Sequence, residues 1–200
     1  MTHLPNFSLA QSGKVSSLFI AHGATHYYDA VGYLKELPYR RLDNPRDLSS
    51  VFAQQGGTFT ARHALLVQLA REQGVMDLSL TLCVYELNEE DCPEVSQTLR
   101  HYGLSTLPEI CGCLKYRQQL YTLAEDNLCL RREVVSEVEI APAQIGNFKK
   151  RYHQNYLENW LQLEKLDQKW SVEEVWNIRE ECLHVLTSHW NDGCRQPLAA

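Results

Sequence analysis

Hydrophobic and polar residues follow two different periods along the chain, and each period predicts one kind of element. From Leu78 to Tyr85, leucine or valine alternates with other residues, which is the period of a β-strand. From Phe59 to Gln73, apolar residues recur at helical spacing. Thr58 is the candidate N-cap of this helix, and Gly74 suits a left-handed C-terminal cap. The sequence thus predicts a helix followed directly by a strand.

The same patterns predict further helices and strands on both sides of this unit. Helices are expected at Thr25 to Leu37 and at Pro93 to Tyr102. A hairpin is expected to pair Glu109 to Lys115 with Gln119 to Leu123, and Val134 to Ile140 is expected to form another strand. Because helices precede and follow a run of strands, the predicted fold class is α+β.

Two helices are predicted to close the chain. An apolar stripe marks the first, and a capping-box pattern at Ser171 opens the second. Lys149, Lys150 and Arg151 lie opposite the stripe, so we expect them on a solvated helix face. The stripe consists of Ile145, Phe148, Tyr152, Tyr156, Trp160 and Leu163.

The length of 200 residues suits one domain with a sizeable core. Residues 1–17 are polar and patternless and are expected to form a poorly ordered or loosely docked N-terminal arm. A single domain is predicted over residues 18–190, followed by a tail over residues 191–200. The hydrophobic fraction of 44% and the charged fraction of 22% are those of an ordinary soluble domain.

Charge and cysteine content restrict the class of protein further. The net charge of −6 argues against a nucleic-acid partner, because nucleic-acid-binding domains present a basic surface. No apolar run approaches the roughly 20 residues of a membrane span, and no signal peptide is recognisable, so we expect no membrane partner and a cytoplasmic location. The seven cysteines are irregularly spaced, and we expect reduced and mostly buried thiols.

Signals for a metal or cofactor are weak. Cys111 and Cys113 have no second cysteine pair at zinc spacing after them, and we expect their side chains to point to opposite faces of the strand. The acidic segment Asn88 to Asp91 lacks the alternating oxygen ligands and the glycine of an EF-hand loop. We therefore predict no metal site and no cofactor.

Several segments in a fixed order resemble one known family. The helix start Gly57-Thr58-Phe59-Thr60-Ala61-Arg62-His63 is followed by Leu107-Pro108-Glu109 and later by Ile140-Ala141-Pro142. In this order they resemble a bacterial branch of the transglutaminase-like superfamily, which typically has Gly-Thr-Cys-Ser-x-Lys-His at this helix start. The resemblance covers about Leu37 to Cys182. It implies a fold related to papain-like cysteine hydrolases, in which a central helix packs on a small antiparallel sheet and two helices follow.

The resemblance also assigns positions to a catalytic triad. In such enzymes a cysteine thiolate attacks a carbonyl, a histidine exchanges protons and an aspartate orients the histidine. Carried over by position, these three residues fall on Phe59, Cys111 and Thr122. Because losing one member of a triad already removes most of the rate, the three replacements imply a catalytically inactive protein. Its expected role is a binding or interaction module for an unknown protein or small-molecule partner.

Two further expectations concern the former active site. The alternative function is a cysteine-dependent acyl-transfer enzyme or hydrolase with a rearranged site, in which Cys111 supplies the thiol and His63 the base. We also expect Phe59, Cys111 and Thr122 to lie side by side, with the phenyl ring leaving a narrow or closed pocket. The candidate ligand-binding residues of the former cleft are Arg62, His63, Tyr85, Glu89 and Glu109.

Overall fold

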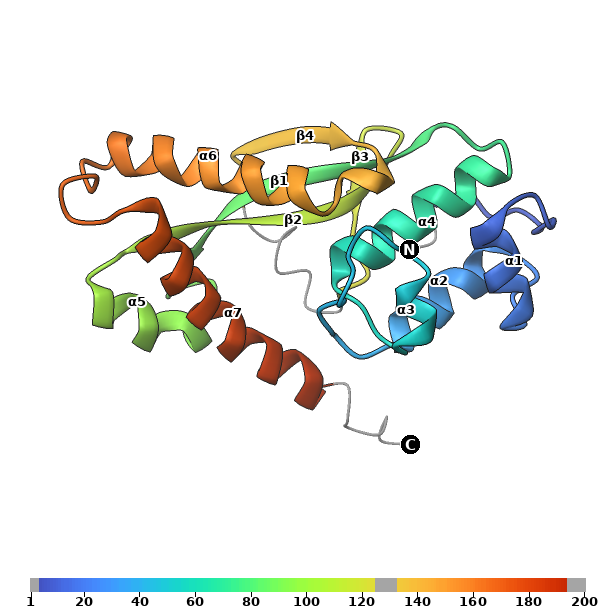
Figure 1. The fold of residues 1–200 in the computed structure, drawn as a ribbon, viewed down its shortest axis with the longest axis horizontal. Coiled ribbons are helices and arrows are strands. Elements are labelled where there is room, and N and C mark those ends of the chain that lie inside the picture. The colour runs from blue at the N-terminus through green and yellow to red at the C-terminus, as the bar shows by residue number, and fades with distance from the viewer. Residues whose placement is uncertain (1–3, 125–132, 194–200) are drawn as a thin grey trace.

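A four-stranded antiparallel sheet forms the centre of the molecule (Figure 1). The computed structural model describes residues 4–124 and 133–193, and these form a mixed α+β fold, as predicted. The strand order is β3-β2-β1-β4. The strands are β1 (Leu78–Asn88), β2 (Thr106–Tyr116), β3 (Gln119–Tyr121) and β4 (Ser136–Ile140).

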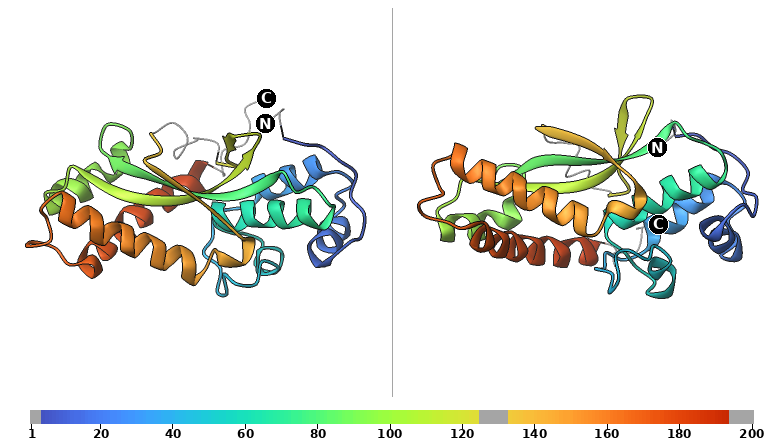
Figure 2. Two further views of the ribbon diagram at one scale, coloured as in Figure 1. Left: turned by 90° about the horizontal axis from the view of Figure 1, so that it is seen from above. Right: turned by 45° about the horizontal axis from the view of Figure 1, so that its top comes forward.

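Two groups of helices lie towards opposite ends of the long strands β1 and β2 (Figures 1 and 2). The N-terminal group consists of α1 (Lys14–Ala21), α2 (Tyr27–Glu36), α3 (Ser50–Ala53) and α4 (Phe59–Glu72). The second group consists of α5 (Ser96–Tyr102), α6 (Asn147–Leu163) and α7 (Val172–Gly193). Short 3-10 turns, η1 (Pro93–Val95) and η2 (Pro142–Gln144), precede α5 and α6.

Alternate residues of β1 pack into two separate hydrophobic cores. Leu80 and Leu82 belong to the core formed with the N-terminal group of helices. Cys83, Tyr85 and Leu87 belong to the core formed with α5, α6 and α7. Because successive side chains of a strand point to opposite faces, the two groups of helices cover opposite faces of the sheet, each over part of its length. The strand predicted from Leu78 to Tyr85 is confirmed, and it extends to Asn88.

Local signals fix both ends of α4, the helix that carries the first part of the site. The Thr58 hydroxyl accepts a hydrogen bond from the backbone N–H of Ala61 at 3.2 Å, as expected of an N-cap. The chain leaves the helix through Gly74 with a φ of 77°, which glycine adopts without strain. The first turn is held on the sheet because the backbone N–H of Gly112 donates to the Thr60 hydroxyl at 3.0 Å.

The predicted hairpin is present with shifted ends. β2 begins at Thr106, three residues before the predicted start, and β3 ends at Tyr121. The connecting residues Arg117 and Gln118 have φ values of 49° and 65°. Positive φ at both positions gives the turn a twist that matches antiparallel strands, although neither residue is a glycine.

Residues 4–17 differ from the expected N-terminal arm, because they are packed on the domain. Leu4 is only 4% exposed, and α1 begins inside this segment, at Lys14. The Glu72 carboxylate accepts the backbone N–H groups of Val15 at 3.1 Å and Ser16 at 2.7 Å. A carboxylate at a helix N-terminus is stabilising, and here it comes from α4, more than 50 residues away in the sequence. The polar composition of the segment gave no sign of this partner.

The two predicted C-terminal helices are present. The backbone N–H of Ser171 donates to the Glu174 carboxylate at 2.8 Å, and the N–H of Glu174 donates to the Ser171 hydroxyl at 3.2 Å, which confirms the capping box. The predicted stripe of α6 is wrong at its C-terminal end, because Leu163 is 79% exposed. The predicted tail begins inside α7, and residues 194–200 lie outside the described residues. No described helix combines the length and apolarity needed to cross a membrane.

Candidate functional site

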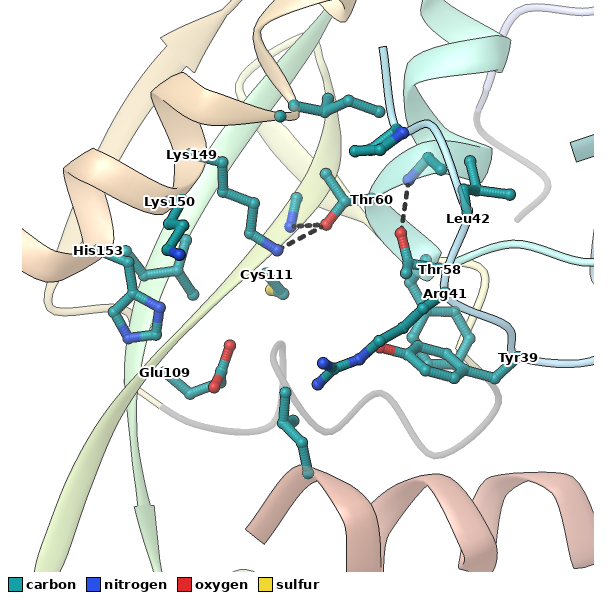
Figure 3. A pocket seen from close by; sticks show the side chains of 18 of the residues that line it. Tyr39, Arg41, Leu42, Thr58, Thr60, Glu109, Cys111, Lys149, Lys150 and His153 are labelled. Atoms are coloured by element: carbon teal, nitrogen blue, oxygen red, sulfur yellow. Dashed lines mark hydrogen bonds between the residues drawn. The ribbon is translucent and has the colours of Figure 1, made fainter. Parts of the chain in front are cut away.

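A pocket of about 380 Å³ opens where α4, β2, α6 and α7 meet. The first turn of α4 contributes Phe59 and Thr60 to its lining, and β2 contributes Glu109 and Cys111. The loop before α3, together with α6 and α7, contributes further lining residues, among them Tyr39, Arg41, Lys149, His153, Arg179 and Trp190. Figure 3 shows several of these side chains arranged around one open space.

The three positions that the resemblance assigns to the catalytic triad all line this pocket. Phe59 comes from the start of α4, Cys111 from the middle of β2 and Thr122 from the residue after β3. The hairpin thus places Cys111 and Thr122 in the lining of the same pocket as the start of α4. The expectation of a narrow or closed pocket is wrong, since the cavity at this point holds about 380 Å³.

The phenyl ring of Phe59 belongs to an aromatic wall of the pocket. Its centroid lies 5.4 Å from that of Tyr39 and 5.2 Å from that of Trp190, and Tyr39 and Trp190 are themselves 4.9 Å apart. The guanidinium carbon of Arg62 lies 5.3 Å from the ring centroid of Phe59. These contacts pack the Phe59 ring into the wall of the pocket, and the cavity beside it stays open.

The thiols of Cys111 and Cys113 lie close together on β2. Their sulfur atoms are 3.4 Å apart, so the expectation that they point to opposite faces is wrong. Residues two apart on a strand share a face, because the side-chain period of a strand is two. Cys113 is buried and Cys111 is partly exposed to the pocket. No group of three or more potential metal ligands of the types His, Cys, Asp and Glu occurs within the described parts of the chain.

His63 is fully buried and does not line the pocket. Its Nε2 accepts a hydrogen bond from the backbone N–H of Leu123 at 2.8 Å. The ring proton therefore lies on Nδ1, which donates to the carbonyl oxygen of Gly112 at 2.5 Å. Both ring nitrogens are engaged by backbone groups, so His63 joins α4 to β2 and to the segment after β3.

The other candidate ligand-binding residues are divided between the pocket and the rest of the molecule. Tyr85 and Glu109 line the pocket. Arg62 is 2% exposed and donates to two backbone carbonyls outside it. Glu89 forms an ion pair with Arg100 at 2.7 Å, on the surface beyond the end of β1. Tyr85 and Glu109 thus line the same pocket as Phe59, Cys111 and Thr122, whereas Arg62, His63 and Glu89 do not line it.

Four alternating charges are linked along the pocket. The Glu109 carboxylate accepts hydrogen bonds from Nε and Nη2 of Arg179 at 2.6 and 2.7 Å. Nη1 of Arg179 donates to Glu180 at 2.6 Å, and Glu180 pairs with Arg41 at 2.6 Å. Burial opposes ionisation of Glu109, but the guanidinium of Arg179 outweighs it and lowers the pKa of Glu109 to about 2. Two carboxylates and two guanidinium groups therefore neutralise one another.

Lys149 supplies a further cation, from the first turns of α6. Its Nζ donates to the Thr60 hydroxyl at 3.1 Å, the same hydroxyl that accepts the Gly112 N–H (Figure 3). Burial lowers the pKa of Lys149. One turn later, Nε2 of His153 donates to the carbonyl oxygen of Pro108 at 2.9 Å. Burial lowers the pKa of His153 as well, so its imidazole is neutral at pH 7.

The prediction of a solvated face for Lys149, Lys150 and Arg151 is wrong for Lys149, which lines the pocket. The spacing of Lys149 and His153, four residues apart on one helix face, was an available signal for a shared environment. Arg179 was also missed. It lies three residues after Trp176, inside the apolar stripe of α7, where a charged residue indicates a buried ion pair.

Comparisons of the chain with protein-family models, with curated proteins and with solved structures find no match. The site is therefore interpreted from its own geometry. It combines an aromatic wall, a neutralised charge chain and a hydrogen-bonded ammonium around a cavity large enough for a small molecule. Such a combination of apolar surface and a few convergent polar groups is typical of ligand-binding sites.

Proposed function

We propose that this protein is a catalytically inactive member of the transglutaminase-like superfamily that binds a ligand in the pocket at its former active site. One observation carries the proposal. Phe59, Cys111 and Thr122, which stand at the three triad positions by resemblance, line one open pocket of about 380 Å³. A cavity that persists where the reactive side chains are replaced favours retention of binding over retention of catalysis.

The chemistry of the three replacements supports the inactive assignment. Phenylalanine has no nucleophilic atom, and threonine has no charge that could orient an imidazole. Acyl transfer through a thiolate needs a nucleophile, a base within about 2.6–3.2 Å of it and a group that orients the base. None of these roles can be filled at Phe59 or Thr122 by the residues present.

The alternative function, an enzyme with Cys111 as nucleophile and His63 as base, has less support than the inactive binding protein. A general base must have a nitrogen available to take the proton. Nδ1 of His63 is bonded to the Gly112 carbonyl and Nε2 to the Leu123 N–H, so proton uptake would break a buried hydrogen bond. Losing such a bond leaves a buried donor unsatisfied, which costs about 1–3 kcal/mol.

Substrates of transglutaminases and of cysteine-dependent hydrolases provide the test. Purified protein is incubated with a glutamine-donor peptide and an amine, with p-nitrophenyl acetate and with a thioester, each with and without iodoacetamide. We expect wild type and Cys111→Ala to give the same background rates, unchanged by alkylation. Multiple turnover that is lost both on alkylation and in Cys111→Ala would contradict the proposal.

A further inference from the structure

Six charged side chains line the pocket, and four of them neutralise one another. Arg41, Glu180, Arg179 and Glu109 form the linked chain of ion pairs described above. The remaining two are Lys149, whose pKa is lowered by burial, and the exposed Lys150, so basic side chains outnumber acidic ones in the lining by two. The protein as a whole has a net charge of −6. The excess is therefore a local property of the pocket.

The ammonium group of Lys149 has hydrogen-bonding capacity that the described protein does not use. An ammonium carries three N–H donors. Within residues 4–124 and 133–193, the hydrogen bond of Lys149 is the one to the Thr60 hydroxyl. Lys149 is partly buried and lines the pocket, so its two remaining donors are directed to an acceptor in the pocket, either solvent or a ligand.

Thr60 adds a donor at the same place. Its oxygen accepts from the Gly112 N–H and from Lys149 Nζ, so its own hydrogen remains for donation. Figure 3 shows Lys149 and Thr60 meeting at one edge of the open space, next to Cys111. The N-terminus of α4 carries a partial positive charge that acts in the same direction. These donors lie close together at one edge of the pocket, where they can meet an anionic oxygen.

Aromatic side chains form another part of the wall. Tyr39, Phe59 and Trp190 form the aromatic cluster, and Trp176 lines the pocket from α7. The two carboxylates of the charge chain lie in the same pocket and disfavour a ligand with several negative charges. A small monoanion with an apolar body matches both parts of the lining.

We propose that the pocket binds an organic carboxylate with an aromatic or apolar body. The carboxylate accepts hydrogen bonds from Lys149 and Thr60, and the body packs against the wall formed by Tyr39, Phe59 and Trp190. This inference rests on the proposed function, because it names the ligand class for the same pocket.

Two probes of equal size and different charge test the inference. Phenylacetate and phenylacetamide are titrated into the full-length protein, and binding is followed by calorimetry and by tryptophan fluorescence, since Trp176 and Trp190 line the pocket. We expect wild type to bind phenylacetate at least tenfold more tightly than phenylacetamide. Lys149→Met should remove this preference, and Lys149→Arg should retain most of it. Arg151→Met, an exposed charge on the same helix outside the pocket, should leave both affinities within twofold.

Each outcome separates the inference from the proposal on which it rests. Equal affinities of the two probes for wild type, no binding of phenylacetate, or an unchanged preference in Lys149→Met would overturn the inference. If both probes bind equally, ligand binding in the pocket stands and the assigned charge recognition falls. Failure of the proposed function would appear separately, as thiol-dependent turnover in the catalytic assay.

Discussion

The Glu109 carboxylate shows how much a single buried charge depends on its partner. It is 3% exposed and bonded through both oxygens to Arg179. Removing one member of such a pair typically costs about 3–5 kcal/mol, because the other charge stays buried. The pair therefore holds β2 to α7 and at the same time neutralises a carboxylate that lines the pocket.

The pKa of Glu109 predicts a pH dependence of stability. The pKa of Glu109 is about 2 in the folded protein and 4.5 in the unfolded chain, so folding favours the ionised carboxylate. The stability from this group is fully present above pH 4.5 and is lost as the pH falls through 2. It amounts to about 3 kcal/mol at pH 7 and about 1 kcal/mol at pH 3.

The free energy of urea unfolding, measured from pH 7 to pH 3, tests this prediction. Glu109→Gln cannot titrate, so its stability should fall by about 2 kcal/mol less than that of wild type over this range. Glu158→Gln, at an exposed carboxylate on α6, serves as the control and should change the slope little. Parallel pH profiles of wild type and Glu109→Gln would show that the carboxylate is not stabilised as described.

Phe59→Cys alone is not expected to create an acyl-transfer enzyme. The new thiol would lie at the N-terminus of α4, which lowers the pKa of a thiol. It would still lack a base, since the position that the resemblance assigns to the histidine holds Cys111 and both nitrogens of His63 are bonded to backbone groups. Hydrolysis of p-nitrophenyl acetate should stay at the wild-type rate. An alkylation-sensitive rate well above that of wild type would show that another group can act as the base.

At the scale of elements, the contact between α4 and β2 positions the whole site. Gly112 lies against Thr60, and a methyl group placed on Gly112 would come within 2.6 Å of Cγ2 of Thr60. Such overpacking of a well-filled contact costs about 1–3 kcal/mol. The same contact holds the Thr60 hydroxyl within hydrogen-bonding distance of Lys149. The packing of α4 on β2 therefore also positions the two side chains that we propose bind the ligand carboxylate.

A double-mutant cycle tests this contact. Gly112→Ala should lower the free energy of unfolding by about 1–3 kcal/mol. Thr60→Ser removes Cγ2 and keeps the hydroxyl, so in the double variant Gly112→Ala should cost less than half as much. The urea-unfolding free energies of the four proteins give the coupling. If the effects of Gly112→Ala and Thr60→Ser on the unfolding free energy are additive, the contact with Thr60 is not the reason that position 112 requires glycine.

Local patterns predicted most of the elements and few of their long-range contacts. The alternation from Leu78 to Tyr85 predicted β1, and the N-cap at Thr58 with the helical spacing after it predicted α4. Both signals act between residues close in the sequence. The packing of residues 4–17 was not predictable in this way, since Glu72 from another helix satisfies the start of α1. The fold class therefore follows from the sequence, whereas the ordered N-terminus depends on tertiary contacts.

At the scale of the whole molecule, the position of the site was predictable and its charges were not. The resemblance led to Phe59, Cys111 and Thr122, and these residues line one pocket. Lys149 and Arg179 come from helices that start 31 and 56 residues after the end of β2, and only the folded arrangement shows that they face it. Lys149 bonds to Thr60 of α4 and Arg179 to Glu109 of β2, and the spacing of residues along the chain does not predict such contacts between elements.

The central claim is that the pocket binds small molecules, and saturation-transfer NMR with a mixture of small aromatic acids, amides and amines tests it most directly. Ala124→Trp places an indole in the pocket, and Met76→Trp adds one at a position that is 72% exposed and outside it. We predict saturation transfer to members of the mixture with wild type and Met76→Trp, and its loss with Ala124→Trp. Equal signals from all three proteins, or no signal from wild type, would contradict the account.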